Sequence, residues 1–246
     1  MNAKAALPSL FTISSLFCGF LSMYYAVNGR FIGAALLIVI AGFLDACDGK
    51  IARYFHTSSN FGVQFDSIVD VCSFGVAPAL LMLYYLKPYY LNALPAIPWL
   101  HFVVCFLFLL CGALRLARFN TQLKGFEKEN FSGLPIPTAA GTLAAYILFT
   151  ERVWQSSTHA PHLAIGLCVI LSLLMISTIE YSAFSRLSIE TRRGRVRLIF
   201  LLCVIVLMVF YTYEVFFPIA LAISLSGLFR WLYYAITDRE VADVRD

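Results

Sequence analysis

The stretch that decides the fold is FIGAALLIVIAGFLDACDGKIARYFHTSSNFGVQFDSIVD, residues 31–70. Its first part is an apolar run long enough to cross the roughly 30 Å hydrocarbon core of a bilayer as a helix. Four aspartates follow: Asp45, Asp48, Asp66 and Asp70. An aspartate costs about 2.5–3.5 kcal/mol at the centre of a membrane helix, so four of them near the hydrocarbon region indicate a function.

Similar apolar runs recur along the whole chain. Of its 246 residues 61% are hydrophobic and only 13% are charged, which is typical of a protein embedded in lipid. Charge clusters, prolines and glycines divide the chain into about eight expected transmembrane helices, at roughly 8–28, 31–53, 64–86, 98–119, 135–152, 161–180, 196–212 and 215–236. The sequence therefore predicts an all-α polytopic membrane protein with a single domain, residues 1–246.

The lysines and arginines divide unequally between the two sides of this predicted membrane protein. With eight spans both termini share one side with most of the 18 basic residues, and only Arg30, Lys87 and Arg152 fall on the other side. Because basic residues are enriched in cytoplasmic loops, we expect both termini to face the cytoplasm. The membrane is expected to be a cell inner membrane. The basic segment 192–197 is expected either to grip a phosphate or to meet anionic headgroups.

The four aspartates form two pairs on neighbouring predicted helices. Asp45 and Asp48 are three residues apart, and Asp66 and Asp70 are four apart, so each pair shares a helix face. A short turn around residues 56–60 would join the two spans as a hairpin, about residues 31–86, in which both pairs meet at one depth near the cytoplasm. Four neighbouring carboxylates repel one another unless protons or cations neutralise them, and their oxygens suit Mg²⁺, Mn²⁺ or Ca²⁺.

Phosphoryl-group chemistry is the function that such a cluster favours. Two divalent cations about 3.5–4 Å apart can bridge phosphoryl oxygens and offset the charge that develops on attacking and leaving oxygens. Gly49, Ala52 and Gly62 leave room for a ligand beside the aspartates, and Arg53 offers a guanidinium fork for phosphate. The alternative of another class is an ion or solute transporter, because intramembrane carboxylates also mark transport pathways.

A resemblance to a known family lies in the spacing of these residues, which reads Asp45-x2-Asp48-Gly49-x2-Ala52-Arg53-x8-Gly62-x3-Asp66-x3-Asp70. This pattern closely resembles the signature of the CDP-alcohol phosphotransferase family, and every fixed position matches. The resemblance implies a bundle of transmembrane helices with an active site open to the cytoplasm, where an alcohol displaces CMP from a CDP-linked lipid. It also implies a homodimer and two divalent cations as cofactors, and no nucleic-acid partner is expected.

The resemblance further implies a role for each residue of the signature. Asp45, Asp48 and Asp66 would bind one cation, and Asp45, Asp66 and Asp70 the other. Asp70 would also act as the catalytic base that takes the proton of the attacking hydroxyl. The residues expected to contact the donor nucleotide are Thr12, Gly49, Ala52, Arg53 and Gly62. No Ser-His or Cys-His pair stands out as a covalent nucleophile, so direct displacement is expected.

A wider match narrows the acceptor alcohol. Five segments resemble the membrane-embedded phosphatidylserine synthases of this family: Pro8–Thr12, Phe17–Phe20, Phe74–Pro78, Ala113–Asn120 and Phe131–Pro137. The resemblance implies CDP-diacylglycerol as the donor and L-serine as the acceptor, with membrane lipids as partners. Ser9 and Ser15 stand where asparagine is usual, which leaves Thr12 as the donor contact on the first span.

The acceptor site is expected in the segment 115–120. A serine acceptor brings a carboxylate, which a planar guanidinium can grip with two hydrogen bonds. The candidate acceptor-binding residues are therefore Arg115, Arg118 and Asn120. Glycerol phosphate or inositol phosphate would also suit arginines, and choline is a further acceptor within the family. As an alternative, the two arginines only anchor the end of a helix.

Overall fold

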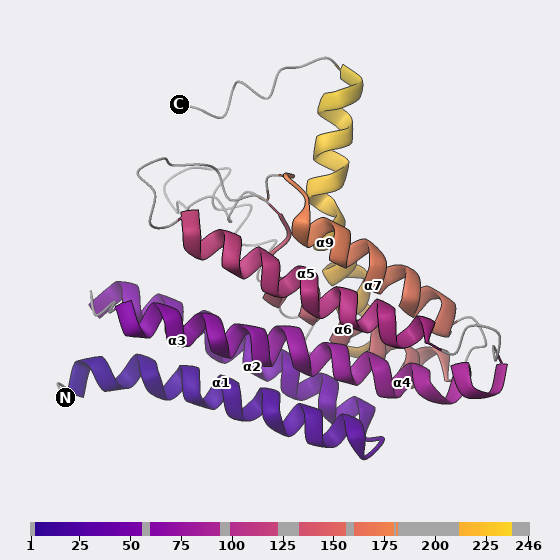
Figure 1. The fold of residues 1–246 in the computed structure, drawn as a ribbon, viewed down its shortest axis with the longest axis horizontal. Coiled ribbons are helices and arrows are strands. Elements are labelled where there is room, and N and C mark those ends of the chain that lie inside the picture. Colours follow the sequence, from indigo (N-terminus) through magenta and orange to yellow (C-terminus); the bar gives the residue numbers. More distant parts are fainter. Residues whose placement is uncertain are drawn as a thin grey trace.

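The computed structural model describes residues 3–55, 60–93, 99–122, 133–155, 160–179, 181 and 212–237. Throughout these ranges the chain is helical apart from short connections (Figure 1). The elements are α1 (Ala3–Val27), α2 (Phe31–Phe55), α3 (Asn60–Asp70), η1 (Val71–Val76), α4 (Ala77–Ala93), α5 (Leu100–Gln122), α6 (Ile136–Phe149), η2 (Thr150–Trp154), α7 (Ala160–Ile176) and α9 (Thr212–Thr237). Within the described ranges five helical segments are long and apolar enough to cross a membrane, which confirms the predicted fold class.

The predicted spans correspond to these helices with shifted ends. The third span was predicted too short, because α3, η1 and α4 form one continuous helix that starts at Asn60 and runs through Pro88 to Ala93. The first helix begins at Ala3, before its proline at position 8. The predicted span at 196–212 lies outside the described residues except for Thr212, and so do residues 56–59 of the predicted hairpin turn and the basic segment 192–197.

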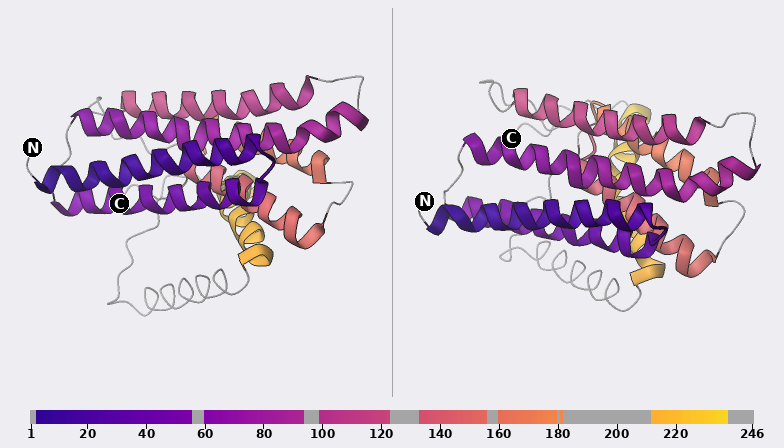
Figure 2. Two further views of the ribbon diagram at one scale, coloured as in Figure 1. Left: turned by 90° about the horizontal axis from the view of Figure 1, so that it is seen from below. Right: turned by 60° about the horizontal axis from the view of Figure 1, so that its bottom comes forward.

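Helices α1, α2 and α5 and the continuous helix formed by α3, η1 and α4 lie side by side along the long axis of the molecule, while α9 is steeply inclined to them (Figures 1 and 2). The tight connection between α1 and α2 is made possible by Gly29, whose φ of 72° is a left-handed conformation that glycine adopts without strain. Helix α6 lies inside the bundle, where it packs against α2, α7 and α9. Its fully buried hydrophobic residues, each at most 1% exposed, are Ile136, Ala139, Ala140, Leu143, Ala144, Ala145, Tyr146, Ile147 and Leu148.

One face of α1 consists of small and polar residues that allow close helix packing. Its buried members are Thr12, Ser15, Ser22 and Ala26, with Gly19 between them. Ser15 Oγ donates to the Ala41 carbonyl of α2 at 3.2 Å, and Ser22 Oγ donates to the Ala34 carbonyl at 2.8 Å. A Cβ atom at Gly19 would lie 2.8 Å from the Cα of Ser73 in η1. This face therefore fixes α1 against both helices that carry the aspartates.

The segment before α6 is held by the end of α7. Gly133 N–H donates to the Ile179 carbonyl and Leu134 N–H donates to the Leu174 carbonyl, each at 2.9 Å. The second bond gives the Leu174 carbonyl in the last turn of α7, which also accepts from Ser177 Oγ at 2.8 Å, a partner outside its own helix. Gly133 has a φ of 88°, and a Cβ there would lie 2.3 Å from the Met175 carbonyl oxygen. Only glycine fits this approach.

Directly after Asp70 the helix widens into the π-helix η1. Its last bond runs from Ala77 N–H to the Cys72 carbonyl, five residues back. Pro78 follows, and because proline has no N–H, the widened turn sacrifices no ordinary bond from that residue. Phe74 and Gly75 are buried here, and a Cβ at Gly75 would lie 3.0 Å from the Leu109 side chain of α5. The segment 74–78 thus packs this helix against α5.

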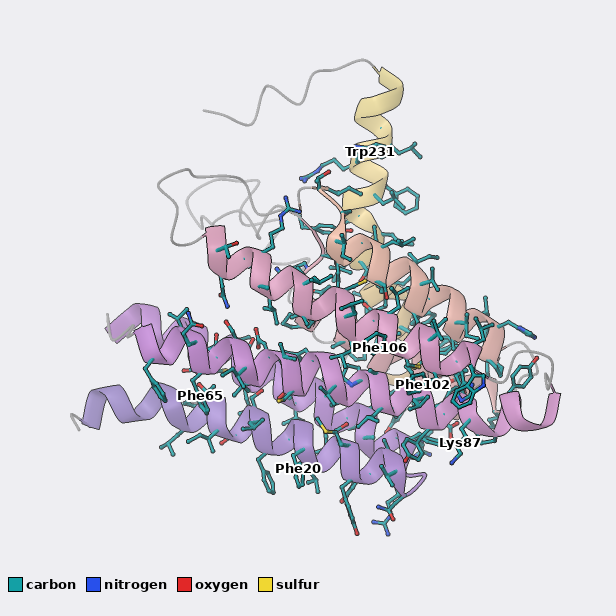
Figure 3. All side chains as sticks on the ribbon, viewed as in Figure 1. Phe20, Phe65, Lys87, Phe102, Phe106 and Trp231 are labelled. Atoms are coloured by element: carbon teal, nitrogen blue, oxygen red, sulfur yellow. The ribbon has the colours of Figure 1, made fainter. Side chains whose placement is uncertain are left out.

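Three basic residues lie at one end of the bundle. Arg30, Lys87 and Arg152 lie at the end that holds the α1–α2 turn, the end of α4 and η2, which we call the Arg30 end (Figures 2 and 3). Each lies over a tyrosine ring, at 5.7 Å for Arg30 and Tyr25, 5.5 Å for Lys87 and Tyr84, and 5.2 Å for Arg152 and Tyr213. The α2 C-terminus and the α3 N-terminus lie at the opposite end (Figure 1).

The sides of the bundle expose large apolar residues, as a membrane-embedded protein requires. Phe20 of α1, Phe102 and Phe106 of α5 and Trp231 of α9 are each at least half exposed (Figure 3). In water such a surface would drive aggregation, whereas in a bilayer it contacts the acyl chains. The several apolar helices and this surface together show a protein embedded in the membrane.

Candidate active site

Three of the four aspartates meet between α2 and α3. One carboxylate oxygen each from Asp45, Asp66 and Asp70 lies within 4.8 Å of the others. Asp45 belongs to α2, whereas Asp66 and Asp70 lie one turn apart on the same face of α3. All three side chains are half-buried. The local sequence thus folds into two helices that present their acidic faces to each other.

The fourth aspartate, Asp48, lies one turn beyond Asp45 and is more deeply buried, at 7% exposure. Its Oδ2 accepts a hydrogen bond from the Thr12 hydroxyl of α1. Electrostatic interactions link Asp48 to both Asp45 and Asp66. The four carboxylates therefore form one charge cluster, which we call the carboxylate cluster. Among the described residues, only Asp45, Asp66 and Asp70 each have a carboxylate oxygen within 4.8 Å of the others.

The carboxylate cluster fits a divalent metal ion. Asp48 Oδ1 and Asp70 Oδ1 are buried and lack hydrogen-bond partners among the described residues. Ionised carboxylate oxygens only accept hydrogen bonds, and burying them unpaired is costly, so a cation is the partner that these atoms require. Within the described part of the chain, Arg115 interacts electrostatically with Asp70. Clustered carboxylate oxygens are also the ligands that Mg²⁺, Mn²⁺ and Ca²⁺ prefer.

The residues expected at the donor nucleotide lie close to the aspartates in the sequence, apart from Thr12. Gly49, Ala52 and Arg53 belong to the last turns of α2, but their side chains lie outside the described residues. Gly62 is exposed in the first turn of α3, one turn before Asp66. Thr12 is buried, and its hydroxyl donates to Asp48. The structure thus gives Thr12 a contact with the carboxylate cluster that sequence reasoning did not foresee.

The three residues expected at the acceptor site lie near the end of α5 but do not share one face. Arg115 is half-buried, lies over the Phe119 ring at 5.8 Å and interacts electrostatically with Asp70. Asn120 is half-buried and bonds to Ser67 of α3. Arg118 is exposed, and helical periodicity puts it about 160° around α5 from Asn120. Asn120 therefore contacts α3 directly and Arg115 interacts with it electrostatically, whereas exposed Arg118 lies nearly opposite Asn120 on the helix.

Ser67 is a polar residue at this site that sequence reasoning missed. It lies between Asp66 and Asp70, at a position that the signature leaves open. Its hydroxyl contacts the Asn120 side chain across the two helices. A hydroxyl on a membrane helix beside two aspartates was the available signal, but a serine can equally bond to its own helix, as Ser67 also does to Val63.

Comparison with known proteins places the chain in a family. Residues 5–170, about two thirds of the chain, match the family model for CDP-alcohol phosphatidyltransferase. A protein of Helicobacter pylori (strain J99), named CDP-diacylglycerol–serine O-phosphatidyltransferase, is 34% identical over 236 residues, which covers 96% of this chain and 95% of the relative. A Bacillus subtilis protein of the same name is 34% identical over 185 residues, or 75% of this chain and 94% of the relative.

An archaeal protein extends the similarity. The archaetidylserine synthase of Methanothermobacter thermautotrophicus is 35% identical over 178 residues, which covers 72% of this chain and 69% of the relative. Proteins of this family generally depend on divalent metal, in agreement with an acidic group that can bind one. With three aspartates of the signature within 4.8 Å of one another and the match covering most of the sequence, this chain belongs to the CDP-alcohol phosphatidyltransferase family.

Proposed function

We propose that this protein transfers the phosphatidyl group of CDP-diacylglycerol to the hydroxyl of L-serine, forming phosphatidylserine and releasing CMP. The observation that carries the proposal is the meeting of Asp45, Asp66 and Asp70 within 4.8 Å, in a membrane-embedded member of this family. The choice of serine is supported by the names of the relatives, which include a protein similar over nearly the whole chain.

In this proposal the carboxylate cluster holds two divalent cations. Asp45, Asp48 and Asp66 bind one, and Asp45, Asp66 and Asp70 bind the other. When bound, such ions supply positive charge that stabilises the phosphoryl oxygens of the transition state. The unpartnered Oδ1 atoms of Asp48 and Asp70 support these ligand sets. Thr12 holds the opposite oxygen of Asp48 and so fixes which oxygen is free for the ion.

The reaction is a direct displacement at phosphorus. The serine hydroxyl oxygen bonds to the phosphorus that carries diacylglycerol, and the bond from this phosphorus to the oxygen of CMP breaks. Asp70 takes the hydroxyl proton, because a hydroxyl needs a base and this carboxylate has an unpartnered oxygen. We assign Gly49, Ala52, Arg53 and Gly62 to the nucleotide, and Arg115, Arg118 and Asn120 to the acceptor.

We further propose that the carboxylate cluster and both termini face the cytoplasm, within a cell inner membrane. The three basic residues of the Arg30 end would then face outward, in agreement with the enrichment of basic residues in cytoplasmic loops. This orientation lets a soluble acceptor reach the cluster from the cytoplasm while the acyl chains of the donor stay in lipid. We also propose that the whole chain is one catalytic domain that acts as a homodimer.

The test is CMP release by the purified protein from CDP-diacylglycerol in detergent micelles with Mg²⁺ or Mn²⁺. We expect release to require an added alcohol and L-serine to be the best of a panel that includes glycerol phosphate, inositol phosphate and choline. Release with another alcohol only would move the protein to a sibling activity of the family. No release with any alcohol, together with ion or solute flux in proteoliposomes, would favour the transporter alternative.

A matched arm tests the metal. Excess chelator should abolish CMP release, and added Mg²⁺ or Mn²⁺ should restore it. Metal binding to the protein without substrate, measured by equilibrium dialysis with Mn²⁺, should be lost when Asp45 and Asp66 are both replaced by Asn. Binding that survives both replacements would contradict the assignment of the ions to this cluster.

A further inference from the structure

Ser67 and Asn120 join the helix that carries two of the aspartates to the helix that carries the candidate acceptor residues. Asn120 Nδ2 donates to Ser67 Oγ at 2.9 Å. Ser67 Oγ also lies 3.1 Å from the Val63 carbonyl oxygen and 3.2 Å from Asn120 Oδ1. Both side chains are half-buried, so water competes less with these bonds than at an open surface.

The number of protons decides how this contact is arranged. A hydroxyl has one proton, so Ser67 donates either to Val63 or to Asn120 Oδ1. Because the Asn120 amide already donates to Ser67 Oγ, the arrangement that satisfies most groups has Ser67 donating to the Val63 carbonyl. The amide nitrogen of Asn120 then faces Ser67, and its oxygen keeps its lone pairs for another donor.

The position of this amide oxygen gives it a chemical use. Ser67 and Asp70 are three residues apart on α3, so they share a face of the helix. Arg115 on α5 interacts electrostatically with the same Asp70. Beside the candidate base, α5 therefore offers a guanidinium and an amide oxygen. An α-amino acid with a hydroxyl has the two complementary groups, a carboxylate and an ammonium.

We propose that Ser67 is a positioning residue for the acceptor, which holds the Asn120 amide so that its oxygen accepts a hydrogen bond from the ammonium group of L-serine. The inference rests on the proposed function and deepens it, because it states which group of serine this pair recognises. Glycerol phosphate and inositol phosphate have no ammonium group, so an amide held in this way selects against them.

The test compares two acceptors that differ only in the ammonium group, L-serine and 3-hydroxypropionate. In Ser67→Ala the amide loses its fixed orientation, so the KM for L-serine should rise about tenfold, the effect of weakening one hydrogen bond to a charged group. The KM for CDP-diacylglycerol and the affinity for Mn²⁺ should stay unchanged. With 3-hydroxypropionate the variant and the wild type should have the same kcat/KM, so the preference for serine should fall.

Two controls separate positioning from folding. Ser67→Thr keeps the hydroxyl and should restore the KM for serine. Ser14→Ala removes an exposed hydroxyl on α1 that bonds to the Leu10 carbonyl one turn earlier, as Ser67 does to Val63, but has no partner on another helix among the described residues. It should behave as wild type. A melting temperature of Ser67→Ala in detergent close to that of Ser14→Ala would show that the fold is retained.

The outcomes distinguish this inference from the proposed function. A wild type that makes phosphatidylserine, with an unchanged KM for serine in Ser67→Ala, would overturn the inference and leave the function standing. An equal loss with both acceptors would also overturn it, because the contact would then not concern the ammonium group. A wild type that releases no CMP with serine would overturn both.

Discussion

At the scale of single residues, Asp66 combines two opposing effects. Its carboxylate adds a negative charge to a half-buried cluster, which destabilises the fold without metal, and it supplies a ligand when metal binds. For Asp66→Asn we expect kcat for CMP release to fall about a hundredfold or more, the size of effect seen when one electrostatic contribution to a transition state is removed. We also expect the metal-free variant to melt at a higher temperature than metal-free wild type, since one repulsive charge is gone.

The matched control for this prediction is Glu151→Gln, which removes an exposed carboxylate in η2 at the Arg30 end. It should leave unchanged both CMP release and the melting temperatures measured with and without metal. Added Mg²⁺ at 100 times its dissociation constant should stabilise the wild type by about 2.7 kcal/mol and Asp66→Asn by much less. A full metal-dependent rise in melting temperature in Asp66→Asn would contradict the ligand role.

Thr12 offers a second prediction at this scale. Thr12→Val keeps the shape of the side chain but removes the hydroxyl that donates to Asp48, so the affinity for Mn²⁺ should fall about tenfold to hundredfold. Thr12→Ser should restore most of it, and Ser22→Ala, elsewhere on the same face of α1, should have no effect. Mn²⁺ binding measured by electron paramagnetic resonance without substrate gives the affinity.

The same variants test the role that the sequence predicts for Thr12. If Thr12 contacts the donor nucleotide and not Asp48, the KM for CDP-diacylglycerol will rise while the Mn²⁺ affinity stays the same. The sequence could not show the contact with Asp48, because the two residues are 36 positions apart on different helices. Hydropathy predicts that both helices exist, but it does not predict their rotation about their axes.

At the scale of helices, the close approach of α1 to η1 depends on Gly19. A Cβ at this position would lie 2.6 Å from Ser73 Oγ and 2.8 Å from Ser73 Cα, and the second contact cannot be relieved by a rotamer change. Gly19→Ala should therefore destabilise the protein by about 1–3 kcal/mol through overpacking. The melting temperature in detergent, with metal present, measures the effect.

Gly166→Ala is the control for this substitution. Gly166 lies in α7, and a Cβ added there would have no neighbour within 4 Å among the described residues. We expect a neutral effect or a gain of up to about 1 kcal/mol from helix propensity. Equal melting temperatures for the two variants would show that the α1–η1 contact does not limit stability.

The sequence predicted these helices better than it predicted how they end and pack. The break between α1 and α2 was predicted between residues 28 and 31, and Gly29 there adopts the left-handed conformation. Helix α7 ends at Ile176, four residues before its predicted end, and the Leu174 carbonyl in its last turn bonds to the segment that precedes α6. Such a contact between distant segments leaves no trace in local hydropathy.

For the site, the sequence predicted that the aspartates belong together, and the structure brings Asp45, Asp66 and Asp70 within 4.8 Å. Spacing sufficed here, since i, i+3 and i, i+4 residues share a helix face. It did not suffice for α5, where Arg118 and Asn120 lie on different faces although both were assigned to the acceptor. Which face of α5 approaches α3 is decided by packing of the whole bundle, including Gly75 against Leu109.

At the scale of the whole molecule, the orientation in the membrane can be tested directly. In a variant without native cysteines, a single cysteine at exposed Asn28 should react with a membrane-impermeant thiol reagent from outside intact cells. A cysteine at exposed Thr121, at the other end of the bundle, should react only after the membrane is opened. The proposed cytoplasmic location of the carboxylate cluster requires this pattern, and labelling at position 121 in intact cells would contradict it.

The π-helix η1 is a place where the chain can lose a residue without turning the site. A π-turn accommodates one residue more than an α-turn, so deleting a single residue between Val71 and Val76 would let an ordinary α-helix form while Asp66 and Asp70 keep about the same rotation relative to α4. The same deletion within α4, which is α-helical, would turn both aspartates by about 100° relative to the rest of that helix, because each residue of an α-helix corresponds to that angle. In this continuous helix η1 is thus the segment whose length can change by one residue while the two aspartates still face Asp45.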